Sequence, residues 1–248
     1  MTDLITTYKN FINCGFAGIT PMAPASEQQI AKFCEEYSQE HNMPPPEELV
    51  TMVRIANGAN WGDEEGWGFE WLTEVDQQTG PALERSINLL PDGCGNSLIV
   101  DVKSDGSLGP VLFNCHDPMS ITIYAPSLKT FFEREQKSAK KHGRILLDEE
   151  NFLELLFNFE DIGLSYEQVM SGSSKGLKSY AEKIGPNNLF IDFRTCKTGL
   201  SFHYHPTRKE PMARDWPALR DGDNLIFAIP LIEHPPTIMQ RIQSLFGK

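Results

Sequence analysis

The sequence predicts an α+β fold in which a mostly antiparallel sheet is covered by helices and is followed by a smaller α+β domain. Residues 98–102 and 121–125 have the period of two that indicates strands with two unlike faces, and 111–113 is a third short apolar run. Apolar residues at helical spacing come before and after these runs. An antiparallel sheet needs a helix layer on one face to bury its apolar side.

Turn residues between the three runs predict a meander of three strands. Asp-Gly at 105–106 and Gly-Pro at 109–110 come before the middle run, and His-Asp-Pro at 116–118 follows it. Glycine tolerates positive φ and proline fixes φ, so each pair or triplet favours a turn.

Four helices are expected around this meander. The first covers about 4–12, and the second begins at a capping box, Ser-Glu-Gln-Gln at 26–29. Three prolines at 44–46 introduce the third, and Asn-Gly at 57–58 is expected to end it in a left-handed C-cap. The fourth follows Ser127, the expected N-cap.

A basic run at 134–144 is expected to end this last helix and to lead into a linker. The domain organisation predicted is therefore a first domain at 1–135, a linker at 136–147 and an α+β domain at 148–248. In the last of these, helices are expected after acids at 148–150, after a capping box at 165–168, over 175–184 and after Thr237. Strands are expected at 189–193 and 200–205, paired as a hairpin around 198–199, and at 225–231.

Charge is distributed unevenly along the chain, whose formal net charge is −12. The first 133 residues carry 19 Asp and Glu against 6 Lys and Arg, whereas the remainder carries 15 against 16. An acid-rich half repels nucleic-acid phosphate and anionic lipid and attracts a basic partner. Direct nucleic-acid or membrane binding is not expected, although solubility alone is the commoner reason for such a surface.

Hydropathy and cysteine usage predict a cytoplasmic protein. No segment approaches the ~18 apolar residues that would span a bilayer, and the first residues do not have the pattern of a signal peptide. The cysteines are odd in number and include no CxxC pair, so free thiols are expected in place of disulfides or a zinc site. They are Cys14, Cys34, Cys94, Cys115 and Cys196.

An acidic aromatic stretch at 61–76 is the candidate partner-binding site. Three tryptophans and a phenylalanine alternate there with six acids, a composition typical of protein-binding hot spots. Tryptophan is also often buried, and we expect Trp67 and Trp71 to pack in the core. The residues predicted to contact a partner are Trp61, Asp63, Glu64, Glu65 and Glu70.

No metal site, cofactor or catalytic residue is predicted. His203 and His205 are two apart on an expected strand, so both would face one side, but no third or fourth ligand accompanies them at ligand spacing. Cys115 and His116 are adjacent in sequence and adjacent side chains rarely converge, so a turn is the favoured role for His116.

The order of these parts resembles the SUKH superfamily, also called the Smi/Knr family, over about residues 26–135. The resemblance implies a single mixed sheet with helices on one side. The residues that carry it are Pro46, Leu49, Ala56, Asn57, Gly58, Asp92, Gly93, Gly95, Asn96, Asp101, Gly109, His116, Asp117, Ala125, Ser127, Phe131 and Phe132.

The resemblance also implies a function. Bacterial members of this family are immunity proteins that bind and silence a cognate polymorphic toxin, commonly a nuclease, and fungal relatives regulate cell-wall synthesis through partner binding. We therefore expect a non-enzymatic module in which the exposed side of the helix-covered sheet holds a protein partner. Two alternatives stay open: an intracellular regulator or scaffold, and a metal-dependent hydrolase that uses His203, His205 and His116.

Overall fold

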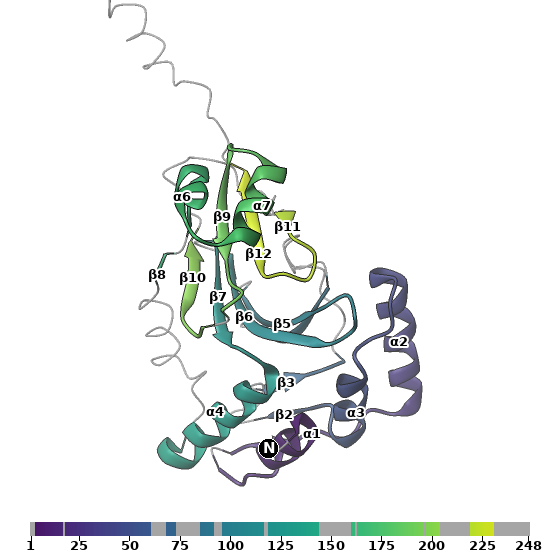
Figure 1. Ribbon diagram of the computed structural model, residues 1–248. Coiled ribbons are helices and arrows are strands. Elements are labelled where there is room, and N and C mark those ends of the chain that lie inside the picture. Colours follow the sequence, from purple (N-terminus) through teal and green to yellow (C-terminus); the bar gives the residue numbers. More distant parts are fainter. Residues whose placement is uncertain are drawn as a thin grey trace, which may run out of the picture.

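The computed structural model describes residues 3–16, 18–60, 68–72, 85–91, 96–116, 119–143, 160–161, 163–195, 197–203 and 219–230. These residues form an α+β protein (Figure 1), as the sequence predicts. The described helices are α1 (Leu4–Ile12), α2 (Glu27–His41), α3 (Glu47–Ile55), α4 (Leu128–His142), α6 (Tyr166–Ser171) and α7 (Lys175–Ile184).

The central sheet has six described strands in the order β4-β5-β6-β7-β10-β8. They are β4 (Ser86–Pro91), β5 (Ser97–Val102), β6 (Leu108–His116), β7 (Met119–Ala125), β10 (Leu200–His203) and β8 (Glu160–Asp161). All neighbours are antiparallel except β10 and β8, which are parallel. The predicted meander is confirmed, because β5, β6 and β7 are consecutive and antiparallel.

Two smaller sheets accompany the central one. The first has the order β1-β2-β3 and lies beside α1 and α3 in Figure 1. The second has the order β11-β12-β9 and lies beside α6 and α7. Their strands are β1 (Thr20–Pro21), β2 (Gly58–Asn60) and β3 (Gly68–Glu70), and β11 (Leu219–Arg220), β12 (Ile226–Pro230) and β9 (Asn188–Asp192).

Helix starts follow the local sequence closely. Ser26 and Gln29 form the predicted capping box at the start of α2, with the Gln29 backbone N–H donating to Ser26 Oγ and the Ser26 N–H donating to Gln29 Oε1. Ser165 and Gln168 do the same for α6. Ser127 caps α4, as expected. These contacts satisfy backbone donors that the first turn of a helix leaves without partners.

Helix α4 extends further than the sequence suggested. It ends at His142 and is capped by Gly143 with φ +69°, so residues 136–142 of the expected linker are helical. Ser138 and Ala139 in this part are buried, which explains why the helix continues through a run rich in lysine. Lysines close to its C-terminus also face the negative end of the helix dipole.

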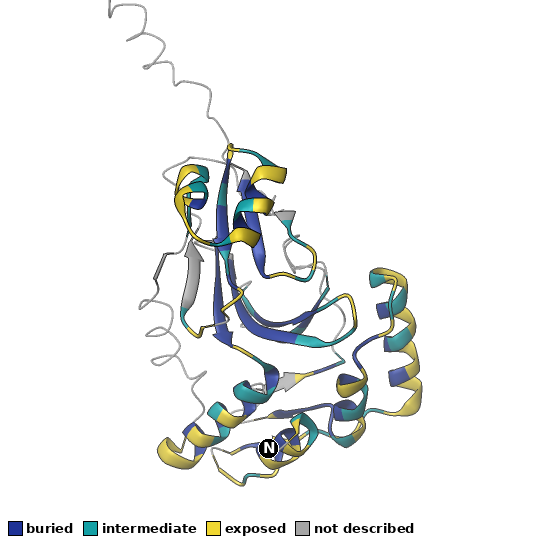
Figure 2. Ribbon diagram, viewed as in Figure 1, coloured by how far each residue is buried: buried dark blue, intermediate teal, exposed yellow. Residues whose placement is uncertain are grey.

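Helices cover one face of the central sheet with a continuous apolar core (Figure 2). The sheet contributes alternate residues such as Val100 of β5 and Phe113 of β6, and α4 contacts both β6 and β7. Trp71 and Phe132 lie in this core, with the Trp71 ring edge-on to Phe132. The expected packing of Trp71 in the interior is confirmed, since its exposed fraction is 2%.

The second face of the central sheet is also covered. Ile99, Leu112, Ile121 and Ile123 point away from the helices and are buried against the β9 and β12 layer. The expectation that this sheet keeps an exposed side is therefore wrong for these strands. Both faces of the alternating strands are apolar here, as Ile99 in β5 shows, and two apolar faces require two covering layers.

The C-terminal layer has its own outer cover. Phe190 of β9 and Ile226 of β12 are buried against α6 and α7, together with Val169, Leu177 and Tyr180.

Strand pairing crosses the predicted domain boundary, because β10 and β8 come from the C-terminal part of the chain and extend the central sheet.

The predicted hairpin between 189–193 and 200–205 is wrong. β9 pairs with β12, whereas β10 pairs with β7 and β8, so the two segments lie in different sheets. The turn at Gly199 (φ +85°) exists, but its N–H donates to Ile123 O of β7 at 2.9 Å. Both faces of β9 are buried, with Ile191 on one side and Phe190 on the other. Pairing with β12 buries both faces, and this outweighs the short connection that would favour a hairpin with β10.

Gly109 and Pro110 lie inside β6 and do not form a turn of their own. The register between β5 and β6 shifts at this point, from Val100↔Val111 to Val102↔Leu108. Such a β-bulge leaves a backbone N–H unpaired and so tolerates proline. Gly109 is required for space, because a Cβ there would lie 2.7 Å from Asp101 Oδ2. The predicted turn at 105–106 does form, with Gly106 at φ +81°.

Among the described residues, Cys14, Cys34 and Cys115 are not in disulfides, as expected for these cysteines. Cys94 and Cys196 lie outside the described residues. Within the part of the chain that the structure describes, every helix is too short or too polar to cross a bilayer.

Candidate partner-binding surface

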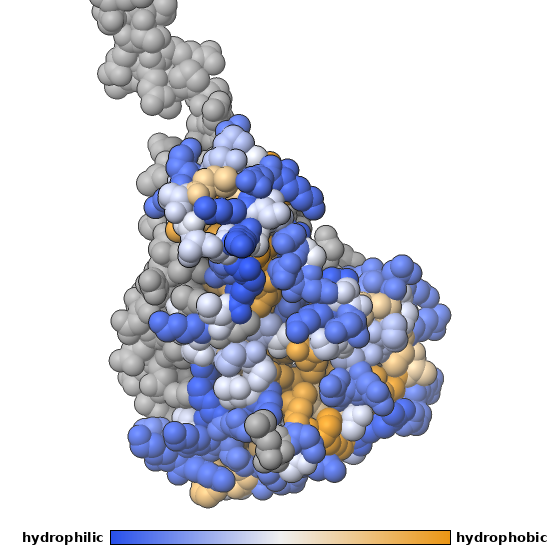
Figure 3. Space-filling view, viewed as in Figure 1, coloured by the Kyte–Doolittle hydropathy of each residue, from blue (hydrophilic) through white to orange (hydrophobic). Residues whose placement is uncertain are grey.

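The helices α2 and α3 form an amphipathic pair. On α2, Ile30, Phe33 and Tyr37 are buried, at the spacing of one helical face. α2 ends at His41 and is capped by Asn42, a non-glycine residue with φ +53°, and Pro46 is the N-cap of α3. With the apolar stripes of both helices facing the core, their charged residues are directed to solvent. Figure 3 shows mostly hydrophilic side chains over α2.

Most of those charged residues are acidic. Residues 27–55 contain six glutamates against one lysine and one arginine, a net charge of −4. All six are exposed. They are Glu27, Glu35, Glu36, Glu40, Glu47 and Glu48, and we call this set the acidic helix surface.

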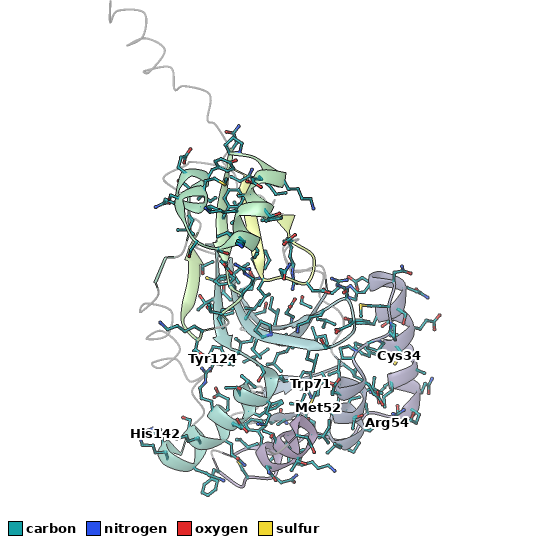
Figure 4. All side chains as sticks on the ribbon, in the orientation of Figure 1. Cys34, Met52, Arg54, Trp71, Tyr124 and His142 are labelled. Atoms are coloured by element: carbon teal, nitrogen blue, oxygen red, sulfur yellow. The ribbon has the colours of Figure 1, made fainter. Side chains whose placement is uncertain are left out.

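Two of the six glutamates have a cationic partner. Arg54 of α3 donates two hydrogen bonds to the Glu27 carboxylate, Nε to Oε1 at 3.0 Å and Nη2 to Oε2 at 3.1 Å. This pair joins the end of α3 to the start of α2; Figure 4 labels Arg54 and, on the neighbouring helix, Cys34. Within α2, Lys32 Nζ lies 3.6 Å from Oε1 of Glu36, which is one helical turn after Lys32. Both pairs are solvent-exposed and contribute little stability.

The other four lack such neutralisation. Among the described residues, no Lys or Arg lies within ion-pair distance of Glu35, Glu47 or Glu48, and Glu40 has only the His41 ring at 3.9 Å. Within the described part of the chain, the acidic helix surface therefore presents a negative charge that no Lys or Arg neutralises at these four positions.

Helix-dipole energetics account for only part of this arrangement. Glu47 and Glu48 lie in the first turn of α3, where the positive end of the dipole stabilises acids. Glu40 lies in the last turn of α2, where the dipole has the opposite sign and favours a cation. The helix dipole does not explain a glutamate at that position, and positions that violate a local rule are often functional.

The Glu27–Arg54 pair gives a prediction about pH. The hydrogen bonds from Arg54 hold the pKa of Glu27 below its ordinary value of 4.5. A lowered folded-state pKa means that the pair contributes stability above pH 4.5 and loses it as pH falls through the folded-state pKa. We expect Arg54→Gln to return the pKa of Glu27 toward 4.5 in a carboxyl NMR titration. An unchanged pKa in this variant would contradict the assignment to Arg54.

Glu70, one of the predicted partner residues, lies at the end of β3 and is exposed. Its Oε1 accepts a hydrogen bond of 2.7 Å from Asn57 Nδ2. Asn57 Oδ1 accepts from the Leu72 N–H, and Asn57 O from the Trp71 N–H. The expected left-handed C-cap at 57–58 is wrong, because α3 is capped by Ala56 in an extended conformation. Asn57, the residue before β2, instead bonds Glu70 of β3 and the two residues that follow it.

Trp71 next to this strand is fixed from two sides. Its indole Nε1 donates to Tyr8 Oη at 3.2 Å, and Tyr8 Oη donates to Ala56 O at 2.8 Å. Burial raises the pKa of Tyr8 above its ordinary value. These two hydrogen bonds connect α1, the residue that caps α3 and the residue after β3. Figure 4 shows Trp71 and Met52 in this interior.

The other predicted partner residues lie outside the described residues. They are Trp61, Asp63, Glu64 and Glu65, together with Trp67, for which core packing is expected. Their role stays a prediction. The structure adds the acidic helix surface, which sequence reasoning did not select although the signal was present: several glutamates at exposed positions of two well-defined amphipathic helices.

The histidines of the hydrolase alternative are only partly described. His116 ends β6 opposite Met119 of β7, and His203 ends β10 opposite Ser120 of β7. His205 lies outside the described residues. Within the described ranges, no three His, Cys, Asp or Glu side chains form a group that could hold a metal ion.

Comparisons with known proteins give no relative. No family model, no curated protein and no solved structure matches this chain.

Proposed function

We propose that this chain is a non-enzymatic protein-binding module of the immunity type, which binds and neutralises a basic toxin in the cytoplasm. The observation that carries the proposal is the acidic helix surface, on which four exposed glutamates have no Lys or Arg partner among the described residues. The resemblance of residues 26–135 to the SUKH superfamily supports the immunity type.

A nuclease is the toxin class that fits this surface best. A nuclease must present Lys and Arg to hold nucleic-acid phosphate. Carboxylates on a rigid pair of helices mimic those phosphates and compete for the same cations. Long-range attraction accelerates the encounter, and aromatic side chains such as those expected at Trp61 would supply short-range affinity.

The proposal is tested with the toxin reading frame expected next to the gene for this chain. Co-expression should restore the growth of cells that produce the toxin, and the purified pair should form a complex. Its association rate constant should fall as salt is added, because screening shortens the range of attraction between exposed charges. Persistent toxicity together with the absence of a complex would contradict the proposal.

The two alternatives predict different results in the same experiments. A regulator or scaffold would bind a host protein and leave the toxin active. A metal-dependent hydrolase would retain stoichiometric zinc or manganese after purification, which elemental analysis detects.

A further inference from the structure

A buried ion pair joins the C-terminal layer to the central sheet. Asp101 of β5 is fully buried beside the bulge at Gly109. Arg220 of β11 donates to both of its carboxylate oxygens, Nη1 to Oδ1 at 2.6 Å and Nη2 to Oδ2 at 2.9 Å. The Arg220 side chain is only 11% exposed, so both charges of this bidentate pair are largely removed from water.

A second set of contacts surrounds this pair. Asp223, in the turn between β11 and β12, accepts a hydrogen bond from Arg85 Nη2 at 3.1 Å and one from the Ser104 N–H at 2.7 Å. The Ser104 hydroxyl also donates to Asp223. β11 is thus attached to β5, and the β11–β12 turn is attached to the residue before β4 and to the β5–β6 turn.

The surface below these contacts is apolar. Ile99, Leu112, Ile121 and Ile123 of the central sheet are buried by side chains of the C-terminal layer. The layer contributes Ile191, Phe193, Leu225, Phe227 and Ile229. If the layer separated from the sheet, this apolar face would meet water.

We propose that Arg220 is a positioning residue that latches the C-terminal layer onto the second face of the central sheet. The Asp101 carboxylate cannot stay buried without its cation, so the first half of the sequence depends on a residue of the second half. The two halves then unfold as one cooperative unit. The second face is closed to any partner, which leaves the helix side of the molecule for recognition.

The physical reason is an asymmetry in the cost of buried charges. Removing one member of a buried ion pair leaves the other charged, buried and unpaired, which is strongly destabilising, whereas replacing both by well-packed hydrophobic residues of similar volume is often neutral. Arg220 also places its guanidinium 5.8 Å from the Phe227 ring centroid, so a substitution should preserve the apolar stem.

The test compares Arg220→Met with the double variant Asp101→Leu/Arg220→Met. Methionine keeps the length of the stem and removes the charge, and leucine in the double variant replaces the buried carboxylate by an apolar side chain of similar volume. We expect Arg220→Met to increase hydrogen exchange at β9, β12 and β7 together, by at least about 100-fold, and to increase binding of a dye specific for exposed apolar surface. The double variant should recover most of this protection.

Arg194→Met is the matched control, because Arg194 also pairs with an aspartate, Asp192, but at a more exposed position in the C-terminal layer. It should leave exchange in β7 unchanged. Equal loss of protection in the single and double Arg220 variants would overturn the proposal, since packing and not charge would then hold the layer. Increased exchange confined to the β11–β12 turn would overturn it as well. If Arg220→Met does not fold, folding of the double variant supports the latch, and failure of both contradicts it.

Discussion

Replacing Phe132 with alanine is expected to lower the free energy of unfolding by about 3–5 kcal/mol, the range for truncating a buried phenylalanine. The Phe132 side chain is fully buried. Its ring centroid lies 5.2 Å from that of Tyr8, 5.1 Å from Phe11 and 5.2 Å from Phe131. The variant therefore leaves a cavity where α1 meets α4. Urea unfolding followed by tryptophan fluorescence measures the loss.

Phe16→Ala is the control for this variant. Phe16 is 43% exposed, so its truncation should change the free energy of unfolding by less than about 0.5 kcal/mol, as is usual for surface substitutions. A loss below about 1 kcal/mol for Phe132→Ala would show that the helix side of the sheet is not packed as described.

Reversing two charges on the acidic helix surface is expected to slow association with the toxin partner on the order of 10-fold or more at low salt, because electrostatic steering raises association rates by 10-fold to 1000-fold. The variant is Glu35→Lys/Glu40→Lys, since both residues are exposed on α2 and neither has a Lys or Arg partner in the described part of the chain. Stopped-flow measurements at several salt concentrations give the rate constants, and the difference from the unmodified chain should shrink as salt is added.

The matched control is Glu167→Lys/Glu182→Lys. Both glutamates are exposed, on α6 and α7 of the C-terminal layer, and the change in net charge is the same. We expect the control to associate at nearly the original rate. Equal slowing in both double variants would mean that net charge and not the acidic helix surface steers the partner.

Local features of the fold were predictable from sequence. The capping boxes at Ser26 and Ser165 and the cap at Ser127 were assigned correctly, because their contacts lie within one helical turn. The β5-β6-β7 meander was predictable for the same reason, since its turns are short and its strands are neighbours in sequence.

Features that depend on distant residues were not predictable. The β9–β12 pairing and the burial of Ile99 on the second face depend on side chains far apart in the sequence. From sequence alone, Gly109 indicates a turn. Its actual role, to leave space for the Asp101 carboxylate, depends on a contact with another strand. Asn57 likewise has a capping composition, yet its side chain bonds Glu70.

The candidate site was predictable only in part. Aromatic and acidic composition pointed to 61–76, of which Glu70 is described and exposed. The carboxylates of Glu35 and Glu40, which have no Lys or Arg partner among the described residues, were not selected, because whether a glutamate has a cationic neighbour depends on the packing of α2 against α3. Arg54 shows the point: its partner Glu27 is on the other helix.

The pairing of β10 with β7 has a consequence for synthesis on the ribosome. Ser201 of β10 lies opposite Thr122 of β7. Because these residues are far apart in the sequence, β10 is translated long after β7 has left the exit tunnel. During that interval the edge of β7 has open backbone groups and Ile121 and Ile123 lack their cover, the conditions under which nascent chains associate wrongly. Rapid translation of the last third of the message, or a chaperone that shields this edge, should therefore increase the yield of native protein.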